Sequence, residues 1–272
     1  MSLQPIRRVD SVRWDGTQRL KGRDPLVVEE PLEIRLNGKP VAVTMRTPGH
    51  DFQLAAGFLF TEGILTSAFQ VGAIVHCEEE GEDRRGNVVN VLTDPGAPPP
   101  DEGWQRRFYV SSSCGICGRS SIDAVRQAAS SLNDPSRFDP EVLYALPDLL
   151  RSSQGIFCET GALHAAALFT PEGRLRVLME DVGRHNAVDK VVGSAFLDEG
   201  VPVKAHLLLV SGRLSFEITQ KALMAGIPAL AGISGASSLS VDLAREAGML
   251  LAGFLRGRTM QVYAGAERLY GA

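Results

Sequence analysis

Two of the four cysteines in this 272-residue chain, Cys114 and Cys117, form a Cys-x-x-Cys pair in the glycine- and serine-rich segment 111–118. A buried free cysteine usually behaves as a small hydrophobic residue, whereas a reactive one needs a partly exposed, electropositive setting that stabilises the thiolate. The glycines and serines predict exposure. Arg119 and the positive end of a helix expected from about residue 120 would both lower a thiol pKa. The pair is therefore a candidate for sulfur chemistry.

Four interpretations of the pair stay open on the residues alone. A structural zinc site needs two more Cys or His ligands, and the isolated positions of Cys77, Cys158 and His164 disfavour it. A dithiol oxidoreductase is the second, although thioredoxin-like pairs lie near a βαβ pattern with little glycine around them. The third is sulfur transfer, in which a thiolate carries a sulfane sulfur as a persulfide. Two unreactive surface thiols are the fourth.

A second group of ionisable residues lies in the segment 180–190, which follows a predicted strand and opens a helix. Ligands of α/β sheets bind at the carboxyl ends of the strands. Histidine titrates near neutral pH, so His185 is a candidate for proton transfer together with Asp181. The alternative is a capped helix start whose charges are solvated.

Three further segments bring small or cationic residues to predicted strand ends. Ser211-Gly212-Arg213 and the segment 232–238 have small residues that let backbone amides approach a phosphate or nucleotide. A Gly-Ser turn is equally common as a simple connection. In the segment 254–259, the guanidinium groups of Arg256 and Arg258 suit phosphates or a base edge, unless the segment is only an exposed charged hairpin.

The first half of the chain predicts a small α+β unit. Apolar and polar residues alternate over residues 33–45 around Asn37-Gly38, a pair typical of a tight hairpin turn. A helix is expected over residues 52–60, closed by Gly63. Further short strands are expected at 87–92 and 108–110.

The second half predicts alternating strands and helices. A helix from about residue 120 leads into it, followed by another that begins at Asp139-Pro140 and is interrupted by Pro147. Strands then alternate with helices that begin near positions 183, 215 and 238, the strands being 165–169, 175–179, 205–210, 228–233, 250–255 and 261–263. Such alternation predicts an α/β sheet covered by helices. We therefore expect a small α+β domain over residues 24–110, a mobile Cys-x-x-Cys loop over 111–119 and an α/β domain over 120–272.

Composition narrows the functional classes. The net charge of −4 gives no general attraction to nucleic acid or to an anionic membrane. No run of about 18 apolar residues is present to span a bilayer. Residues 1–23 are polar and lack the apolar core of a secretory signal, so we expect a cytoplasmic protein whose thiols are kept reduced.

Long motifs occur in a fixed order over about residues 29–269. In the second half these are Ser-Ser-Cys114-Gly-Ile-Cys117-Gly, Thr160-Gly-Ala-Leu-His164-Ala-Ala, Glu180-Asp-Val-Gly-Arg-His-Asn-Ala-Val-Asp-Lys190, Ser211-Gly-Arg-Leu-Ser-Phe-Glu217 and Ala225-Gly-Ile-Pro228. Earlier in the chain are Glu30-Pro-Leu-Glu-Ile-Arg-Leu-Asn-Gly38, Thr44-Met-Arg-Thr-Pro-Gly49 and Gly57-Phe-Leu-Phe-Thr-Glu-Gly63. Together they resemble the formate dehydrogenase accessory sulfurtransferases (FdhD).

The resemblance implies a sulfurtransferase of the carrier type, which is required for formate dehydrogenase activity. Such a protein accepts sulfur from a cysteine desulfurase as a persulfide on Cys114, with Cys117 as a helper. It transfers the sulfur to the molybdenum bis(molybdopterin guanine dinucleotide) cofactor before insertion into formate dehydrogenase. It is commonly a homodimer, and no metal ligands are implied. The implied cofactor-binding residues are Phe254, Leu255, Arg256, Gly257, Arg258 and Thr259, with Ser211, Gly212, Arg213 and His185 as pocket walls.

Two residues depart from the family pattern, since Ala162 stands where a glycine is common and Thr259 where an arginine is common. The family's larger domain is similar to the cytidine deaminase fold. Deaminase chemistry is excluded, because His164-Ala165-Ala166 lacks the glutamate of the His-x-Glu motif and the Cys-x-x-Cys lies upstream without the proline. A cofactor-binding chaperone without sulfur transfer and a cytosolic dithiol oxidoreductase remain alternatives.

Overall fold

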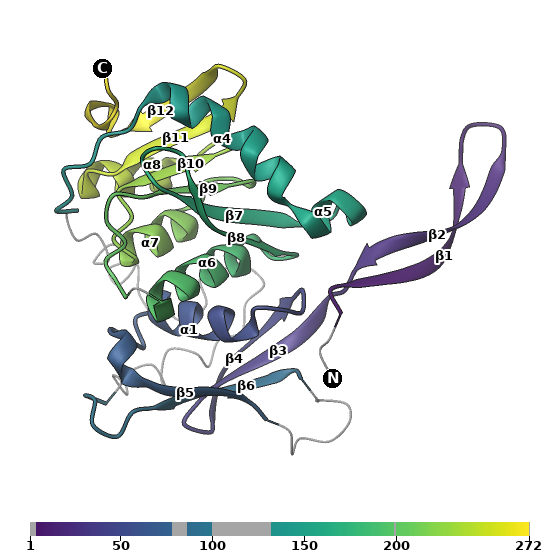
Figure 1. The fold of residues 1–272 in the computed structure, drawn as a ribbon, viewed down its shortest axis with the longest axis horizontal. Coiled ribbons are helices and arrows are strands. Elements are labelled where there is room, and N and C mark those ends of the chain that lie inside the picture. Colours follow the sequence, from purple (N-terminus) through teal and green to yellow (C-terminus); the bar gives the residue numbers. More distant parts are fainter. Residues whose placement is uncertain (1–3, 78–85, 100–131, 199, 272) are drawn as a thin grey trace.

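The computed structural model describes residues 4–77, 86–99, 132–198 and 200–271 (Figure 1). Cys114 and Cys117 lie outside the described residues, as do the loop 111–119, the predicted strand 108–110 and the helix predicted from about residue 120. The domain limits 24–110, 111–119 and 120–272 remain a prediction.

The first half forms a four-stranded sheet in the order β4-β3-β6-β5, covered on one face by a helix. The elements are β3 (Glu30–Leu36), β4 (Lys39–Arg46), α1 (Asp51–Thr61), η1 (Ala68–Gln70), β5 (Val71–His76) and β6 (Val88–Thr93). Asn37 and Gly38 have φ values of 50° and 78°, the left-handed conformations that a tight hairpin turn needs. The predicted hairpin, the predicted helix and the strand near 87–92 are confirmed. Strand β5 was not predicted.

The second half forms a six-stranded sheet in the order β12-β11-β10-β9-β7-β8. Its strands are β7 (His164–Phe169), β8 (Leu175–Asp181), β9 (Leu207–Val210), β10 (Ala229–Gly232), β11 (Leu250–Arg256) and β12 (Thr259–Ala264). Its helices are α4 (Pro140–Ser153), α5 (Gly155–Thr160), α6 (Arg184–Asp198), α7 (Phe216–Met224) and α8 (Ser238–Ala247). The predicted strands and helices from residue 165 onward are all present. The predicted α/β fold with a smaller α+β unit before it is confirmed.

Side chains that alternate along the strands of the large sheet enter two different cores. Leu208 and Leu230 pack with α1, α6, α7 and α8 on one face, whereas Leu207, Leu209 and Ala229 pack with α4 on the other. This is the period-two pattern of a strand that is buried on both faces. The small sheet and α1 therefore lie on the face opposite to α4 (Figure 1).

One prediction about α4 is wrong, because the helix continues through Pro147. Its start is as expected, with Pro140 in the first turn and the side chain of Asp139 accepting a hydrogen bond from the backbone N–H of Glu141 at 2.9 Å. Leu143, Leu146 and Leu150, on the face that packs on the sheet, are buried on both sides of the proline. Their packing holds the helix together across the missing hydrogen bond. The short helix α5 was not predicted.

The N-terminal residues form an element that the sequence analysis does not predict. Strands β1 (Ile6–Trp14) and β2 (Arg19–Val27) pair as an antiparallel hairpin that projects away from both sheets (Figure 1). Among the described residues, no helix is both long and apolar enough to cross a membrane.

Helices α1 and α6 cross with their backbones in contact. A Cβ atom added to Gly57 of α1 would lie 1.9 Å from the carbonyl oxygen of Asp189. A Cβ atom added to Gly193 of α6 would lie 1.9 Å from the carbonyl oxygen of Gln53. Only glycine fits at either position, so the crossing fixes how the small sheet sits on the large one.

Replacing Gly57 by alanine should destabilise the protein, because the backbone of α6 has to move away from the added methyl group. We expect the free energy of unfolding in urea to fall by about 1–3 kcal/mol, the usual cost of overpacking. Gly155→Ala in α5 is the control, since nothing lies within 4 Å of the added atom there. Equal stability of the two variants would contradict the close crossing.

Candidate functional site at the strand ends

Four strands of the large sheet end at the same edge. Strand β7 is antiparallel to both of its neighbours, and β9, β10 and β11 are parallel, so β8 runs in the same direction as these three. The loops after β8, β9, β10 and β11 and the start of β7 therefore lie together. This is the edge at which α/β sheets bind ligands.

His164, Arg184 and Gly212 meet at this edge. A Cβ atom added to Gly212 would lie 3.6 Å from Nδ1 of His164 and 3.7 Å from Cδ of Arg184. The pKa of His164 is lowered, first by burial and then by the cationic Arg184 and His185. His164 is therefore a neutral imidazole beside a guanidinium group near pH 7.

His185 lies in the first turn of α6, and its partner is a residue that the sequence analysis did not assign. Its Nε2 atom is 2.7 Å from Oε2 of Glu217, which lies in the first turn of α7. Glu217 ends one of the motifs quoted above. The signal that singled out His185, a polar residue opening a helix directly after a strand, applies equally to Glu217.

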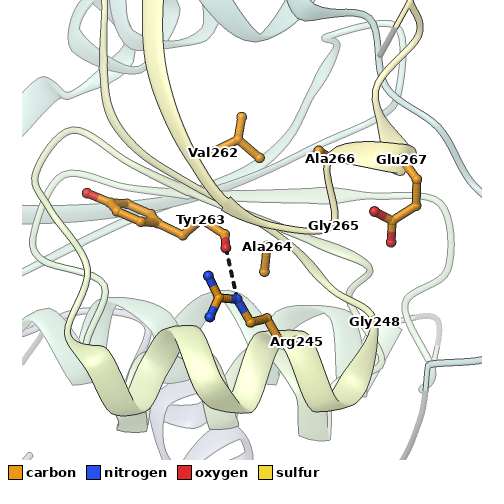
Figure 2. A pocket seen from close by; sticks show the side chains of 8 residues that line it. All are labelled: Arg245, Gly248, Val262, Tyr263, Ala264, Gly265, Ala266 and Glu267. Carbon is orange, nitrogen blue, oxygen red and sulfur yellow. Dashed lines mark hydrogen bonds between the residues drawn. The ribbon is translucent and has the colours of Figure 1, made fainter.

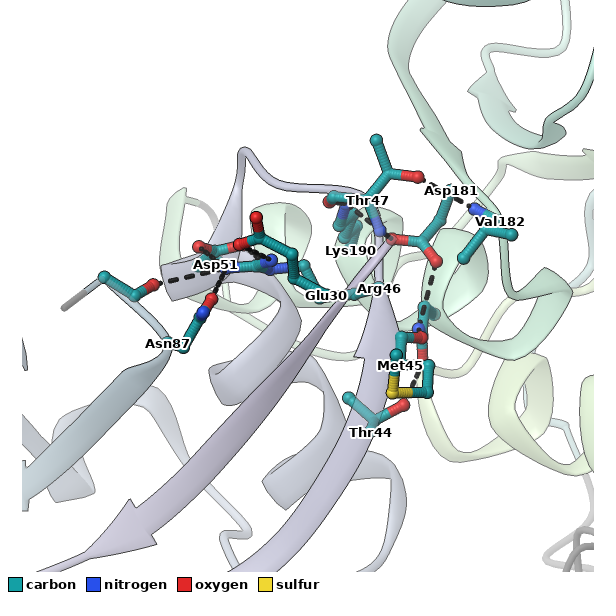
Figure 3. Close-up of polar contacts among 12 residues, drawn as sticks. Glu30, Thr44, Met45, Arg46, Thr47, Asp51, Asn87, Asp181, Val182 and Lys190 are labelled. Carbon is teal, nitrogen blue, oxygen red and sulfur yellow. Dashed lines mark hydrogen bonds and ion pairs between the residues drawn. The ribbon is translucent and has the colours of Figure 1, made fainter. Parts of the chain in front are cut away.

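Asp181 is not available for proton transfer, so the sequence-based assignment of this role to it is corrected. The side chain is completely buried and accepts hydrogen bonds from the N–H groups of Thr47 and Gly183 and from the amide of Asn186. Its Oδ2 atom is also 2.7 Å from Nζ of Lys190 (Figure 3). Asp181 joins β8, α6 and the loop after β4, which is a structural role.

The loops after β9 and β10 are hydrogen-bonded to each other and to β11. The N–H of Leu214 donates to the carbonyl of Gly235 at 3.0 Å, and the N–H of Phe254 donates to the carbonyl of Ser234 at 3.1 Å. Phe254 has φ 51°, which is rare for a residue other than glycine, and its side chain is 43% exposed. Its ring lies over Gly235, where an added Cβ would be 2.7 Å from the ring.

The structure separates the predicted cofactor segment 254–259 into parts. The guanidinium of Arg256 lies 5.8 Å from the centre of the Phe254 ring, at the strand-end site. Leu255 is completely buried in the core on the α4 side. Arg258 turns to α4, where it pairs with Glu141 and lies over the ring of Tyr144. The hydroxyl of Thr259 donates to the carbonyl of Arg256, and Gly257 supplies φ 52° for this turn.

Ser211 and Arg213 differ in how they are placed. The hydroxyl of Ser211 accepts a hydrogen bond from the N–H of Ala165 at 2.9 Å and so ties β9 to β7. Arg213 is exposed. Of the predicted residues, the structure brings together His185, Gly212, Phe254 and Arg256 at the strand-end edge and leaves Leu255 and Arg258 away from it.

A hollow of about 370 Å³ lies at the other edge of the sheet (Figure 2). It is at the end of β12 and of α8, and β12 runs antiparallel to β11, so it is far from the loops that follow β11. No predicted site residue lines it. Its walls are Arg245, Gly248, Val262, Tyr263, Ala264, Gly265, Ala266 and Glu267.

Within the described part of the chain, no group of three or more His, Cys, Asp or Glu side chains is placed to hold a metal ion. Cys77 is partly buried and Cys158 is exposed, and both are free thiols.

The two sheets define a mixed α/β protein, with polar loops gathered at the edge where such sheets bind ligands. The sequence profile described as the FdhD/NarQ family matches residues 27–270. The chain therefore belongs to the FdhD/NarQ family, and the family predicted from the motifs is confirmed.

Curated relatives are similar over almost the whole chain. A protein of Streptomyces avermitilis is 57% identical over 251 residues, which are 90% of this chain and 89% of the relative. A protein of Mycobacterium tuberculosis is 50% identical over 270 residues, 97% of each chain. Both are named sulfur carrier protein FdhD.

A solved structure has the same fold. It is a crystal structure described as that of a formate dehydrogenase accessory protein from Desulfotalea psychrophila, with a TM-score of 0.76 and 24% sequence identity. The match covers 98% of this chain and 100% of the other.

Replacing Arg184 by glutamine should raise the pKa of His164 towards its ordinary value, because a nearby cation that disfavours the imidazolium is lost. Burial remains, so the pKa should stay below the ordinary value. NMR titration of the histidine ring protons measures this. Arg174→Gln, at the opposite end of β7, should leave the His164 pKa unchanged. A shift of similar size in both variants would argue against the contact.

Proposed function

We propose that this chain is a sulfurtransferase of the carrier type that serves formate dehydrogenase. It accepts sulfur from a cysteine desulfurase as a persulfide on Cys114 and passes it to the molybdenum bis(molybdopterin guanine dinucleotide) cofactor before this is inserted into the enzyme. The observation that carries the proposal is the 57% identity, over 90% of the chain, to a protein named as a sulfur carrier. The proposal also includes a cytoplasmic location and a homodimer.

The strand-end site suits a phosphate-bearing substrate. Nε of Arg184 and Oγ of Ser215 are buried there, and neither has a hydrogen-bond partner among the described residues. Buried polar groups are normally hydrogen-bonded, so these two donors suit a ligand oxygen. Gly212 lies beside His164 and Arg184 without a side chain of its own, and the partly exposed ring of Phe254, which lies over Gly235, offers a face for a base.

Sulfur is loaded on Cys114 by a thiol–persulfide exchange. The Cys114 thiolate attacks the terminal sulfur of the donor's persulfide, the donor's S–S bond breaks, and the donor leaves as a thiolate. The new S–S bond is on Cys114. No external oxidant or reductant is used.

Release of sulfur as hydrosulfide gives a role to the second cysteine. The Cys117 thiolate attacks the Cys114 sulfur, forms a Cys114–Cys117 disulfide and expels the terminal sulfur as HS⁻, which is the form that a metal binds. The two cysteine sulfurs supply the two electrons. A cellular dithiol reductant then restores both thiols. If Cys117 attacked the Cys114 persulfide when no substrate was bound, HS⁻ would be lost to solvent.

Two other functions use the same site and are separated by one measurement. A cofactor-binding chaperone needs no sulfur on Cys114, and a dithiol oxidoreductase needs a Cys114–Cys117 disulfide but no persulfide. Mass spectrometry after incubation with a cysteine desulfurase and cysteine should give a one-sulfur adduct on the wild-type peptide that contains Cys114.

Cys114→Ala should abolish this adduct and also the activation of formate dehydrogenase, because the attacking thiolate is removed. Cys158→Ala is the matched control, since Cys158 is an exposed free thiol on α5, and it should retain both. Activation of formate dehydrogenase by Cys114→Ala would overturn the assignment of the carrier. Activation by wild type without any adduct would favour the chaperone.

A further inference from the structure

The hairpin of β1 and β2 is well formed, although little of the molecule supports it. We call residues 6–27 the arm. Its two nine-residue strands pair without a register shift from Ile6 with Val27 to Trp14 with Arg19. The turn is closed by Asp15, whose carboxylate accepts hydrogen bonds from the N–H groups of Thr17 and Gln18.

The outer part of the arm is exposed to solvent on both faces. Every residue from Val12 to Asp24 is exposed, and the arm meets the body mainly where β2 contacts α5. An isolated two-stranded hairpin is marginally stable in water, and stability normally requires a third strand or a packed helix. Within the described part of the chain, the outer half of the arm therefore lacks a packing partner.

The arm exposes large apolar side chains together with a concentration of positive charge. Val12, Trp14 and Leu20 are 45%, 65% and 48% exposed. Strand alternation and the register place Val12 and Trp14 on one face, together with Lys21 and Arg19. Such a mixture of an aromatic residue and arginines is typical of the centre of a protein interface.

The net charge of the arm indicates what kind of surface it would bind. Residues 6–27 contain six arginines or lysines and three aspartates, a net charge of +3. The whole chain carries −4, so the rest of the chain carries −7. A second copy of this chain is therefore electrostatically complementary to the arm.

An acidic surface lies next to the base of the arm. Asp148 of α4 and Glu159 of α5 are exposed, with the exposed Leu149 beside Asp148. Arg151 of α4 is an exposed cation between them in the sequence, with its guanidinium 4.4 Å from the centre of the Phe157 ring, so the two carboxylates outnumber it. Because α5 contacts β2 of the same chain, the α5 end of this surface lies beside the base of the arm (Figure 1). In a two-fold dimer each of the two surfaces can meet its counterpart, which makes a closed interface.

Sequence and structure matches both reach into the arm, although the family profile leaves most of it out. The family profile begins at residue 27, after almost all of the arm. The solved structure nevertheless matches 98% of this chain, and the unmatched part is shorter than the arm. Most of the arm therefore lies within the region matched by a protein that is only 24% identical.

We propose that the arm docks on the acidic surface of α4 and α5 of a second copy of this chain, through Val12, Trp14 and its cationic side chains. One face of the two nine-residue strands presents about half of their residues, which is a substantial share of one side of an interface of typically about 20–30 residues. The inference gives a surface to the homodimer that is part of the proposed function. It is tested by assembly, whereas sulfur transfer is tested at Cys114.

Sedimentation velocity of the full chain is the test. Wild type should sediment as a dimer whose dissociation constant rises with salt, because the contact is partly electrostatic. The double variant Val12→Asp, Trp14→Asp should dimerise at least about tenfold more weakly, as expected on loss of a buried aromatic at an interface centre. Phe69→Asp is the control, since Phe69 is 88% exposed on η1, and it should remain dimeric.

A charge reversal identifies the docking surface. Arg19→Glu with Lys21→Glu should weaken the dimer, and adding Asp148→Lys with Glu159→Lys in the same chain should restore it. Circular dichroism and urea unfolding establish that each variant is folded. Restoration distinguishes docking on α4 and α5 from docking elsewhere.

Three outcomes would overturn the proposal: a monomeric wild type, a dimer indifferent to the arm substitutions, or no restoration by the reversed charges. The sulfur adduct on Cys114 is measured in the same samples. A wild type that dimerises through the arm but takes up no sulfur contradicts the proposed function alone. Arm variants that stay dimeric but no longer accept sulfur would assign the arm to the sulfur donor instead of a second copy.

Discussion

The arrangement of the molecule depends on one contact, the crossing of α1 and α6 at Gly57 and Gly193. Helix α1 carries the small sheet, and α6 begins at the strand-end edge of the large sheet. Because each glycine lies directly against a backbone carbonyl of the other helix, the two helices cannot be closer, and any side chain would separate them. The geometry of the strand-end site relative to the small sheet is therefore set by backbone contact and not by adjustable side chains.

Buried charges surround this crossing and fix its register. Nζ of Lys221 is 2.9 Å from Asp189 and also contacts Thr61 and Glu62. Burial alone would lower the pKa of Lys221, but the carboxylates of Asp189 and Glu62 outweigh it and the pKa is raised. Such pairs add little net stability compared with apolar packing, yet breaking one is costly. These buried ion pairs form only when α1, α6 and α7 are aligned in one way, so they favour that alignment.

The sequence predicted elements more reliably than the direction in which their residues face. Asn37-Gly38 and the apolar alternation after residue 165 act locally, so their structures follow from neighbouring residues. In the sequence the segment 180–190 has the pattern of a single polar cluster, whereas in the structure Asp189 and Lys190 face inward and His185 faces the site. That division depends on the glycine crossing, which is a contact between distant parts of the chain. The arm escaped prediction because its strands are rich in charged residues and have no apolar face against a core.

Strain at the strand ends indicates where this fold serves a purpose beyond stability. The left-handed conformation of Phe254 costs about 1–2 kcal/mol for a residue with a Cβ atom. The hydrogen bond from its N–H to Ser234 and the contact of its ring with Gly235 hold it there, although the ring remains partly exposed. Strain that persists beside glycine-lined loops is commonly found at ligand sites. Because the loops are already bonded to one another, a ligand would meet a formed surface and would pay little to order it. The geometry of Phe254 thus supports the proposal that this edge, with Arg184 and His185 held in place by α6, receives the nucleotide end of the substrate.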